Sequence, residues 1–406
     1  MKRVKFAFGF KHALRAISVL LILTLVFSVT GCSQKKEAGN VKDTPSAADK
    51  AGGSAAQSDG QTNGNSGVQP DGADGTVPDA GQTGDDAGPG KQTIDKEAAF
   101  RAEPASKRTI HIGYDGGLCQ AAIPIAHHKG FFEAEGLKTE LTRTGGTHDN
   151  VRDALAAGKI DTTAGMIAGW LKPITNGIDL KFTVGLHTGC ASAFVLADSP
   201  IRSFADAKGK TIAINGGIGG VYHNIGYRFI AHDGFAPEDF IWRDFPADQT
   251  LLILQKGEAD VAVFSDQLAE KWVQDGTLRR IRSLHSDEDF KNESCCVLGI
   301  SGPFYAENPV TSEKISRAIY KASLWIGESD ANKEEAIQIL LDNDYISGTK
   351  EYALQLMKLF RWGLPNELTE ATLELSITDY QKLGVISSSI DPAELKAQIW
   401  VPLDIE

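Results

Sequence analysis

The sequence has no excess of positive charge. Its 41 lysine and arginine residues are outnumbered by 53 aspartate and glutamate residues, which gives a formal net charge of -12. Nucleic-acid phosphates need patches of lysine and arginine, and none stands out along this chain. We therefore expect no nucleic-acid partner, although an acidic surface remains compatible with an anionic ligand in a local site.

Signatures of catalysis are also missing. The chain contains neither a G-x-S-x-G elbow nor an H-E-x-x-H helix motif. Its densest glycine loop, Gly216–Gly220, is not followed by the Lys-Ser/Thr pair of a nucleotide-binding loop. We expect a protein that is not an enzyme and that carries no cofactor.

The sequence has no long apolar run. An apolar run does occur near the N-terminus, but it is short. It extends from Ala16 to Val29, about 14 residues, whereas a bilayer span needs roughly 20. Basic residues precede it, and Val29-Thr30-Gly31-Cys32 follows it. A basic start, an apolar core and small residues before a cut site predict a secretion signal in residues 1–31.

The cysteine at the end of that run resembles the lipobox of bacterial lipoproteins. The resemblance implies that Cys32 receives a lipid and becomes the mature N-terminus. A lipid-modified cysteine with several acyl chains would be held stably at the membrane. The alternatives are an ordinary signal peptide with a chance cysteine, or an uncleaved anchor.

Residues 32–106 contain few large apolar side chains. Glycine, aspartate, serine, glutamine, threonine and alanine dominate, as in Gly60–Gly67. Such a segment buries too little apolar area to offset the entropy of ordering it. We expect a disordered linker between the lipid anchor and a folded part that starts near Lys107.

Beyond residue 107, short apolar strands alternate with helical stretches. This alternation predicts parallel α/β units, and its restart after residue 210 predicts two lobes. The expected strands are 108–114, 138–142, 159–164, 180–185, 210–214, 240–244 and 259–264, the expected helices are 121–132, 149–157, 168–176, 221–232 and 250–256, and 312–383 is mostly helical.

Several motifs in this order resemble the extracytoplasmic solute-binding proteins of ABC importers, of the nitrate/sulfonate/taurine and thiamine-precursor type. The stretch Lys129–Leu137 resembles the family's G-F-F-x-x-x-G-L segment, and Ala154–Asp161 resembles its A-L-x-x-G-x-x-D segment. The stretch Ile201–Ile212 is similar to the family's entry into the second lobe, with Ala207 where leucine is usual. The stretch Leu254–Ala262 is similar to its G-x-x-D-A repeat.

The resemblance implies a two-lobed, type II periplasmic-binding-protein-like α/β fold. Lobe I would comprise residues 107–193 and lobe II residues 194–297, and 298–406 would return to lobe I and add C-terminal helices. The crossing strands are expected at 193–197 and 297–300. The implied protein is a monomer, anchored on the extracytoplasmic face of the cell membrane. It would deliver a small solute, anionic or containing sulfur or nitrogen, to an ABC-transporter permease.

Ligands of open α/β sheets bind beyond the carboxyl ends of the strands, which selects a set of candidate residues. Glycine loops that feed helix N-termini favour an anionic group, although turn geometry alone also explains such glycines. Trp170 could stack on a ring or pack in the core, and Asp266 could pair with an amine or cap a helix. The candidates outside the cysteines are Tyr114, Asp115, Gly146, Thr147, His148, Trp170, His187, Gly217, Gly219, His223 and Asp266.

Four cysteines fall in the folded part, on three separate loops that the family fold would bring to the cleft: Cys119, Cys190, Cys295 and Cys296. An even count in an exported protein suggests disulfides, and four cysteines allow three connectivities. Buried structural thiols and direct contact with a soft ligand are the alternatives. We expect Cys190 to lie beside Cys295–Cys296.

These cysteines support a rival function. Thiolates are soft metal ligands, and His187 lies three residues before Cys190. A metal- or cofactor-binding lipoprotein, possibly redox-active, would use Cys119, His187, Cys190, Cys295 and Cys296. The spacing is not that of a zinc finger.

Overall fold

The computed structural model describes residues 95–145 and 148–404. The predicted signal peptide, Cys32 and residues 33–94 of the predicted linker lie outside the described residues. Residues 95–106, which we also assigned to the linker, are instead folded. Phe100 is buried, and the Glu103 carboxylate accepts hydrogen bonds from the backbone amides of Val310 and Thr311, both at 2.7 Å. The folded part therefore begins before Lys107, because this segment caps a long helix near the C-terminus.

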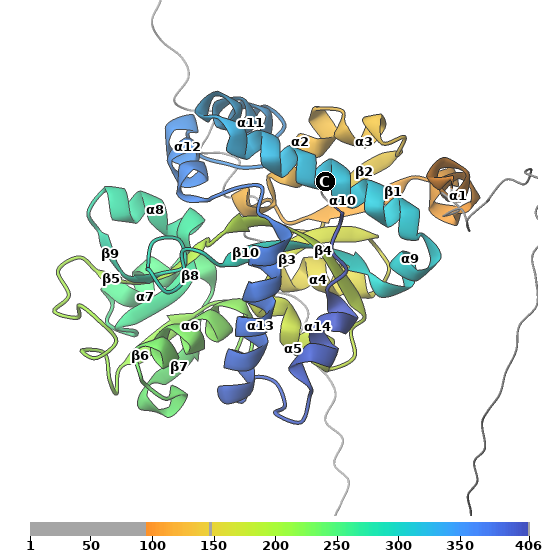
Figure 1. Cartoon of the computed structure of the whole chain (residues 1–406). Helices are drawn as coiled ribbons and strands as arrows, with labels where there is room; N and C mark the ends of the chain where they lie inside the picture. Colours follow the sequence, from red (N-terminus) through yellow and green to blue (C-terminus); the bar gives the residue numbers. More distant parts are fainter. Residues whose placement is uncertain (1–94, 146–147, 405–406) are drawn as a thin grey trace, which may run out of the picture. The chain divides into compact units, whose positions relative to one another are not determined.

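Two five-stranded sheets form the described part of the chain (Figure 1). The first has the strand order β2-β1-β3-β10-β4, and the second has the order β7-β6-β8-β5-β9. In each sheet three strands are parallel, and two others run antiparallel to a neighbour. The strands are β1 (Ile110–Tyr114), β2 (Thr139–Arg143), β3 (Thr162–Met166), β4 (Leu180–Thr188), β5 (Ala191–Leu196), β6 (Thr211–Ile214), β7 (Ile241–Asp244), β8 (Val261–Ser265), β9 (Leu278–Ser283) and β10 (Ser294–Ser301).

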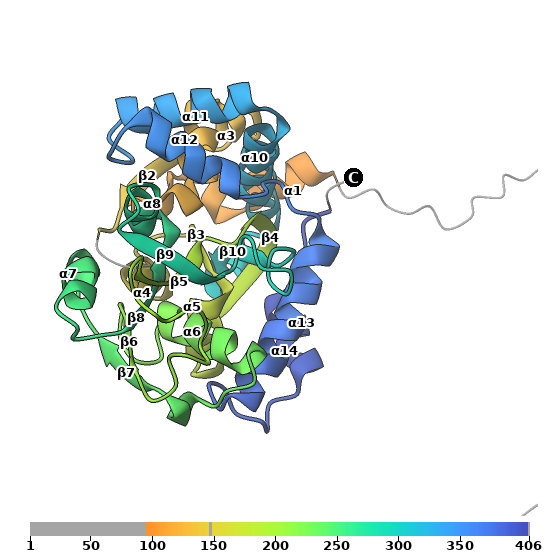
Figure 2. The same ribbon diagram turned by 90° about the vertical axis from the view of Figure 1, so that its left-hand side faces the viewer.

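Helices cover both faces of each sheet. Figures 1 and 2 show α10, α11 and α12 on one side of the first sheet and α13 and α14 on another side. The α-helices are α1 (Lys96–Ala102), α2 (Ala122–His128), α3 (Phe131–Ala134), α4 (His148–Ala156), α5 (Ile167–Thr175), α6 (Val221–His232), α7 (Thr250–Gln255), α8 (Asp266–Gln274), α9 (Gly302–Glu307), α10 (Pro309–Glu328), α11 (Asp330–Asp342), α12 (Lys350–Leu359), α13 (Asn366–Lys382) and α14 (Pro392–Ile399). Short 3-10 turns are η1 (Pro104–Lys107), η2 (Leu118–Gln120), η3 (Pro237–Asp239) and η4 (Ala247–Gln249).

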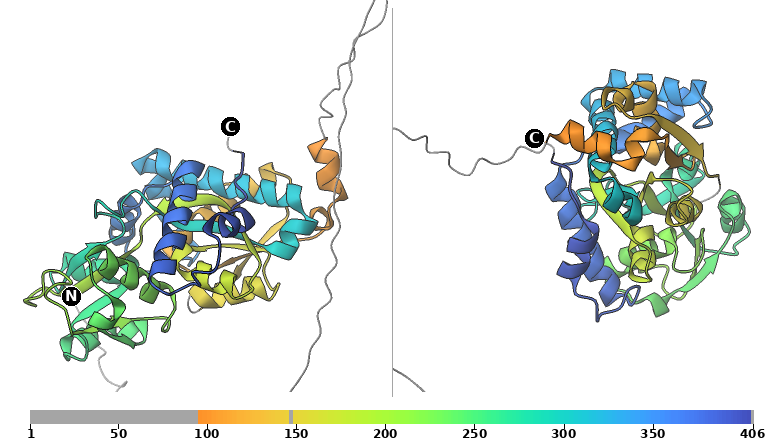
Figure 3. Two further views of the ribbon diagram at one scale, coloured as in Figure 1. Left: turned by 60° about the horizontal axis from the view of Figure 1, so that its bottom comes forward. Right: turned by 90° about the vertical axis from the view of Figure 1, so that its right-hand side faces the viewer.

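The two-lobed α/β architecture is confirmed, and the elements of the second sheet lie together to one side of the first (Figure 3). The chain changes sheets between β4 and β5, at Gly189–Cys190, and again between β9 and β10, over residues 284–293. The crossings we expected at 193–197 and 297–300 therefore lie inside single sheets. The apolar runs that suggested them are strands buried within one lobe. The lobe division 107–193, 194–297 and 298–406 stays a proposal, and the sheet membership agrees with its order while placing the two boundaries earlier, at Gly189–Cys190 and within residues 284–293.

One predicted helix is divided, and several elements were missed, namely β9 and the helices α1, α8, α9 and α14. The predicted helix 121–132 is split into α2 and α3 at Gly130, whose φ of 73° is left-handed and ends the first segment. Strand β9 was missed because its sequence, L-R-R-I-R-S, carries three arginines. Helix α8 was missed because the Ser265-Asp266-Gln267 stretch was assigned to a loop. Ser265 is in fact the N-cap of this helix.

Candidate functional site

A cleft of about 210 Å³, open in part to solvent, lies between the two lobes. A volume of this size suits a small organic molecule or a hydrated ion. The first lobe contributes the turn after β1 and one residue of α4, and the second contributes the ends of β6 and β8 and the starts of α6 and α8. The lining residues are Asp115, Gly116, Gly117, Cys119, Asp149, Asn215, Gly216, Val221, Tyr222, Ala247, Ser265, Gln267 and Leu268.

The turn after β1 is held in place from both lobes. The Asp115 carboxylate accepts from the Gly117 amide at 3.0 Å, which closes a tight turn where the strand ends. The Leu118 amide donates to the side-chain oxygen of Gln267 at 2.7 Å, and Gln267 belongs to α8 of the second lobe. This hydrogen bond crosses the mouth of the cleft.

Further contacts between the lobes show a closed arrangement. The Asn224 amide nitrogen, on α6, donates to the carbonyl of Ala168, on α5, at 2.8 Å. These helices pack so closely that a Cβ built on Gly169 would lie 2.4 Å from Val221. At the hinge, a Cβ on Gly189 would lie 2.4 Å from the backbone of Leu284. Glycine at 189 therefore lets the two interlobe connections pass in backbone contact.

The cleft offers more acceptors than donors. Two carboxylates line it, Asp115 and Asp149, and its described lining holds no lysine or arginine. The side-chain oxygen of Asn215 is buried and has no hydrogen-bond partner. An orphaned buried acceptor costs roughly 1–3 kcal/mol unless a ligand satisfies it. Tyr222 stays a neutral phenol at physiological pH, because burial raises its pKa well above the ordinary value.

The glycine loop before α6 is less available to an anion than its sequence suggested. The Gly217 amide already donates to the Asp244 carboxylate at 2.9 Å, and the Gly219 amide donates to Nδ1 of His223 at 3.2 Å. Gly217 and Gly219 do not line the cleft, whereas Gly216 does. Two of the backbone donors on which the anion-binding expectation depended are thus taken by the protein itself.

His223 lies behind this loop rather than in the cleft. It is buried, with its ring 4.1 Å from that of Tyr227 and 5.2 Å from that of Trp242. Burial lowers the pKa of His223 to about 4. The hydrogen bond from Gly219 requires the same neutral form, since Nδ1 accepts only when it is unprotonated.

We expect His223 to weaken the fold in acid. Above pH 6.5 the ring is neutral in both states, so its contribution to stability is fully present. Between pH 6.5 and about 4 the unfolded chain binds a proton that the folded chain excludes, so stability falls by about 2–3 kcal/mol. Chemical denaturation across this range should show a shallower acid loss in His223→Gln. An unchanged acid loss in that variant would contradict the assignment.

Trp170 and Asp266 lie inside the lobes, away from the cleft lining. Trp170 is 1% exposed and packs beside Phe182, with ring centroids 5.3 Å apart. Asp266 is fully buried, accepts from Ser192 at 2.7 Å and pairs with Arg280 at 3.1 Å. Burial raises the pKa of Asp266. Trp170 thus packs in the core, as one of its two alternatives stated, whereas Asp266 is not the helix cap we expected, because Ser265 is the N-cap and Asp266 instead pairs with Arg280.

The remaining candidates divide between described and undescribed positions. Tyr114 ends β1, is largely buried and stacks edge-on with Tyr345 at 5.1 Å. His148 begins α4, next to the cleft residue Asp149. Gly146 and Thr147 lie outside the described residues.

Cys190 lies beside Cys295 and Cys296, as predicted, whereas Cys119 is the one member of the cluster that lines the cleft. The sulfur atoms of Cys190 and Cys295 are 3.2 Å apart, and hydrogen bonds link Cys190 also to Cys119 and Cys296. All four are buried, and among the described residues none is disulfide-bonded. Cys119 lines the cleft, whereas Cys295 lines a second hollow. The cluster therefore separates the two cavities.

The thiols are not equivalent. Hydrogen bonds from Cys190 and Cys296 lower the pKa of Cys295 well below its ordinary value. Hydrogen bonding to Cys119 raises the pKa of Cys190, and burial raises that of Cys296. The cluster thus favours a single thiolate held by neighbouring thiols.

His187 is fully buried beside the cluster, and backbone carbonyls occupy both of its ring nitrogens. Nδ1 is 2.7 Å from the carbonyl of Thr188, and Nε2 is 2.9 Å from that of Cys119. Phe360 and Trp362 pack on the ring, with centroids 4.9 and 4.8 Å away. A neutral imidazole donates to only one of these carbonyls, and a ring nitrogen of His187 also lies within 4.8 Å of the sulfurs of Cys190 and Cys296.

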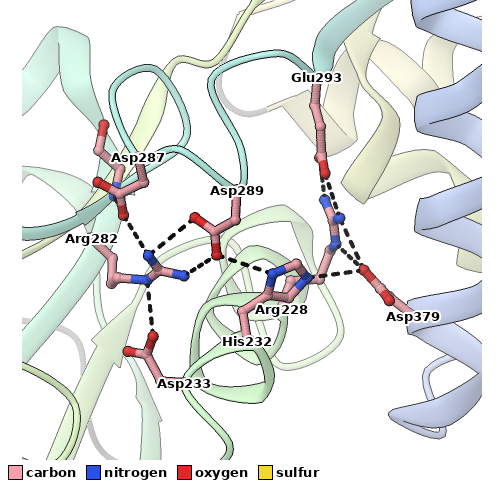
Figure 4. A network of polar contacts seen from close by, with 9 residues as sticks. Arg228, His232, Asp233, Arg282, Asp287, Asp289, Glu293 and Asp379 are labelled. Atoms are coloured by element: carbon pink, nitrogen blue, oxygen red, sulfur yellow. Dashed lines mark hydrogen bonds and ion pairs between the residues drawn. The ribbon is translucent and has the colours of Figure 1, made fainter.

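A network of ion pairs between the lobes was not anticipated from the sequence (Figure 4). Arg228, on α6, binds both oxygens of Glu293 at 2.7 and 2.9 Å and the carboxylate of Asp379, on α13, at 2.9 Å. His232 contacts the same Asp379 at 3.4 Å. The partners of Arg228 are 65 and 151 positions away along the chain, so no local pattern could reveal them.

The comparisons with known proteins agree with this geometry. A model of the NMT1-like family matches residues 103–341. A periplasmic nitrate-binding protein of Synechocystis has a TM-score of 0.61 at 17% identity, over 72% of this chain and 86% of that chain. An alkanesulfonate-binding protein of Xanthomonas axonopodis, bound to MOPS, has a TM-score of 0.59 at 16% identity, over 74% and 99%.

A third structure extends the likeness beyond bacteria. A Candida albicans protein, described as having the generic periplasmic binding protein fold, has a TM-score of 0.59 at 12% identity, over 73% of this chain and 97% of that chain. Identities this low show a shared fold rather than a shared ligand. A search of the curated proteins finds no match.

Proposed function

Because this chain belongs to the NMT1-like family and has the periplasmic-binding-protein fold, we propose that it is a solute-binding protein of an ABC importer. It captures a small solute in the cleft between its lobes and presents it to the membrane permease. No chemical turnover is part of this function. Closure of two lobes around a ligand is a hinge motion that a permease can distinguish from the open state.

The anchored location follows from the N-terminal sequence. A lipid on Cys32 would hold the protein, as a monomer, on the extracytoplasmic face of the cell membrane. The linker up to residue 94 would give the binding lobes reach toward the permease. Within residues 95–145 and 148–404, no helix is both long and apolar enough to cross a membrane.

The lining of the cleft suggests the chemical class of the solute. The Asp115 and Asp149 carboxylates and the orphaned oxygen of Asn215 all accept hydrogen bonds. Asp149 is partly neutralised by Arg152 at 2.5 Å, and Asp115 accepts from the Gly117 amide at 3.0 Å. A nitrate or sulfonate would meet like charge here. The observation that carries our proposal is this set of acceptors, which favours a solute bearing N–H donors or positive charge.

The test compares solutes of opposite charge on the purified protein. Thermal-shift and calorimetric titrations should show binding of cationic or amine- and amide-bearing solutes and none of nitrate or alkanesulfonates. Asp115→Asn keeps an oxygen for the Gly117 amide but removes the charge, so it should weaken a cationic solute about tenfold.

Glu258→Gln is the matched control, because it removes an exposed carboxylate outside the cleft. It should leave the affinity unchanged. Tight binding of an anion that both variants leave intact would overturn the assigned solute class. No binding of any small solute, with mass spectrometry of the purified protein also free of one, would overturn the transport role itself.

A further inference from the structure

The cysteine cluster draws on three segments that are far apart in the sequence. Cys119 comes from the turn after β1, Cys190 from the first interlobe connection, and Cys295 and Cys296 from the start of β10. The sulfurs of Cys190 and Cys295 are 3.2 Å apart, those of Cys190 and Cys296 lie within 4.8 Å of each other, and Cys119 also hydrogen-bonds to Cys190. Four small apolar side chains could pack in the same space. Core packing alone therefore does not explain why all four residues are cysteines.

The conformation of β10 supplies the first part of that explanation. Successive side chains of a regular strand point to opposite faces, which would send one of Cys295 and Cys296 away from the cluster. The pairing of β10 with β4 is irregular here, with register shifts between Ser294 and Cys296 and between Cys296 and Val297. Such irregularities re-aim side chains, and in this strand both sulfurs face Cys190.

We propose that the sulfurs of Cys119, Cys190, Cys295 and Cys296 form a binding site for one soft, thiophilic metal ion of the Zn²⁺, Cd²⁺ or Cu⁺ class. Four-sulfur sites of tetrahedral shape suit such ions. Metal–sulfur bonds of 2.3 Å place the sulfurs about 3.8 Å apart, and the Cys190–Cys295 separation of 3.2 Å is nearer to this than to the ~2.05 Å of a disulfide.

The surroundings of the cluster fit the entry of a cation. Cys119 lies on the wall of the cleft, whose described lining carries Asp115 and Asp149 and no basic side chain. Cys119 is therefore the sulfur that a metal ion in the cleft meets first. Each thiol that ligates loses its proton to solvent, so binding releases protons and strengthens as pH rises.

His187 lies beside this site, with one ring nitrogen within 4.8 Å of the sulfurs of Cys190 and Cys296. Its two ring nitrogens face carbonyl oxygens at 2.7 and 2.9 Å, but a neutral imidazole donates from one nitrogen only, so the other keeps a lone pair. His187 can therefore stand in for one sulfur in a four-coordinate ligand set.

A bound ion would also act on the hinge. Cys190 follows Gly189 in the first connection between the lobes, and Cys295 lies directly after the second. A metal ion ligated by Cys190, Cys295 and Cys119 would link the two interlobe connections to the turn after β1 in the first lobe. This site goes beyond the proposed transport function, since a hinge-binding ion does not depend on which solute fills the cleft.

The experiment uses the full chain carrying Cys32→Ser, in which the cluster supplies every remaining cysteine. The protein is reduced, stripped with a chelator and titrated anaerobically with Cd²⁺ while the ultraviolet sulfur-to-metal charge-transfer absorption is recorded. We expect saturation at about one ion per chain, with proton release and a raised melting temperature. No charge-transfer band would overturn the proposal.

Variants separate a metal site from simple packing. Cys190→Ser and Cys296→Ser should each weaken Cd²⁺ binding at least ~100-fold. Ser294→Ala, a buried change in the same strand whose hydroxyl has no hydrogen-bond partner, should leave binding unchanged. Cys119→Ser, on the cleft wall, gives a further test should a hinge variant fail to fold. Equal affinity in all folded variants would overturn the proposal.

The state of the thiols in protein purified without reductant provides an independent readout. We expect thiols that react with a thiol reagent only after a chelator is added. A Cys190–Cys295 disulfide that forms in place of bound metal, and that excludes Cd²⁺ until it is reduced, would assign the cluster to redox chemistry and overturn the metal site. Solute binding in the cleft is measured separately, so its failure leaves this result intact.

Discussion

Replacing Arg228 with methionine is expected to lower the free energy of unfolding by about 3–5 kcal/mol, measured by denaturant titration. The guanidinium is 6% exposed and is bonded to Glu293 and Asp379. Burial alone would lower its pKa, but the hydrogen bonds and charge of Glu293 outweigh burial and raise it. Removing the cation leaves two carboxylates close together without their shared partner, which is why the expected loss is large.

Arg228→Lys is the matched control for charge. Lysine keeps the positive charge but cannot bind both oxygens of Glu293 in the same plane, so an intermediate loss is expected. Small-angle scattering should also show a larger open population in Arg228→Met, because Arg228 on α6 joins the second lobe to α13 (Figure 4). A loss below 1 kcal/mol with unchanged scattering would mean that this network neither stabilises the fold nor holds the lobes.

The second large effect is expected from Trp170→Ala, which should cost about 3–5 kcal/mol of unfolding free energy. The indole fills the space beside two glycines of the first sheet. A Cβ built on Gly165 would lie 2.3 Å from the ring, and one on Gly299 would lie 1.8 Å from it. The sheet is therefore shaped around this ring, and its removal leaves a cavity that the backbone cannot easily fill.

Trp170→Phe distinguishes packing from ligand contact. It should cost less stability than alanine, because part of the ring volume remains, and it should leave solute affinity within about twofold, since Trp170 does not line the cleft. A loss of solute affinity above tenfold in a folded Trp170→Phe protein would show that the Trp170 ring contacts the solute. Calorimetric titration at a temperature where both proteins are folded provides the measurement.

The predictions that held depended on local patterns. Alternation of strand and helix signals placed most strands and helices, because side-chain periodicity is a property of each segment alone. The rule that ligands bind beyond strand ends selected Asp115 and the glycine loop Gly216–Gly220, and the structure places Asp115 and Gly216 in the lining of one cleft. The expected fold was read correctly in the same way, from short motifs in the right order.

The predictions that needed correction depended on how segments meet. The crossings were misplaced because an apolar strand looks the same whether it joins two lobes or lies within one. The glycine loop looked free to bind an anion, but Asp244 and His223 occupy two of its amides. Trp170 looked as suited to a ligand as to the core until Gly165 and Gly299 were seen beside it.

The sequence by itself determined the α/β alternation and the family likeness, and it predicts the N-terminal export signal, since each of these patterns lies in neighbouring residues. Only the tertiary structure decided that the cleft is lined with acceptors, that Arg228 links the lobes, and that four sulfurs share one buried site. Those features join residues separated by tens to hundreds of positions, such as Cys119 and Cys295. Their proximity depends on the packing of whole lobes, which no local pattern encodes.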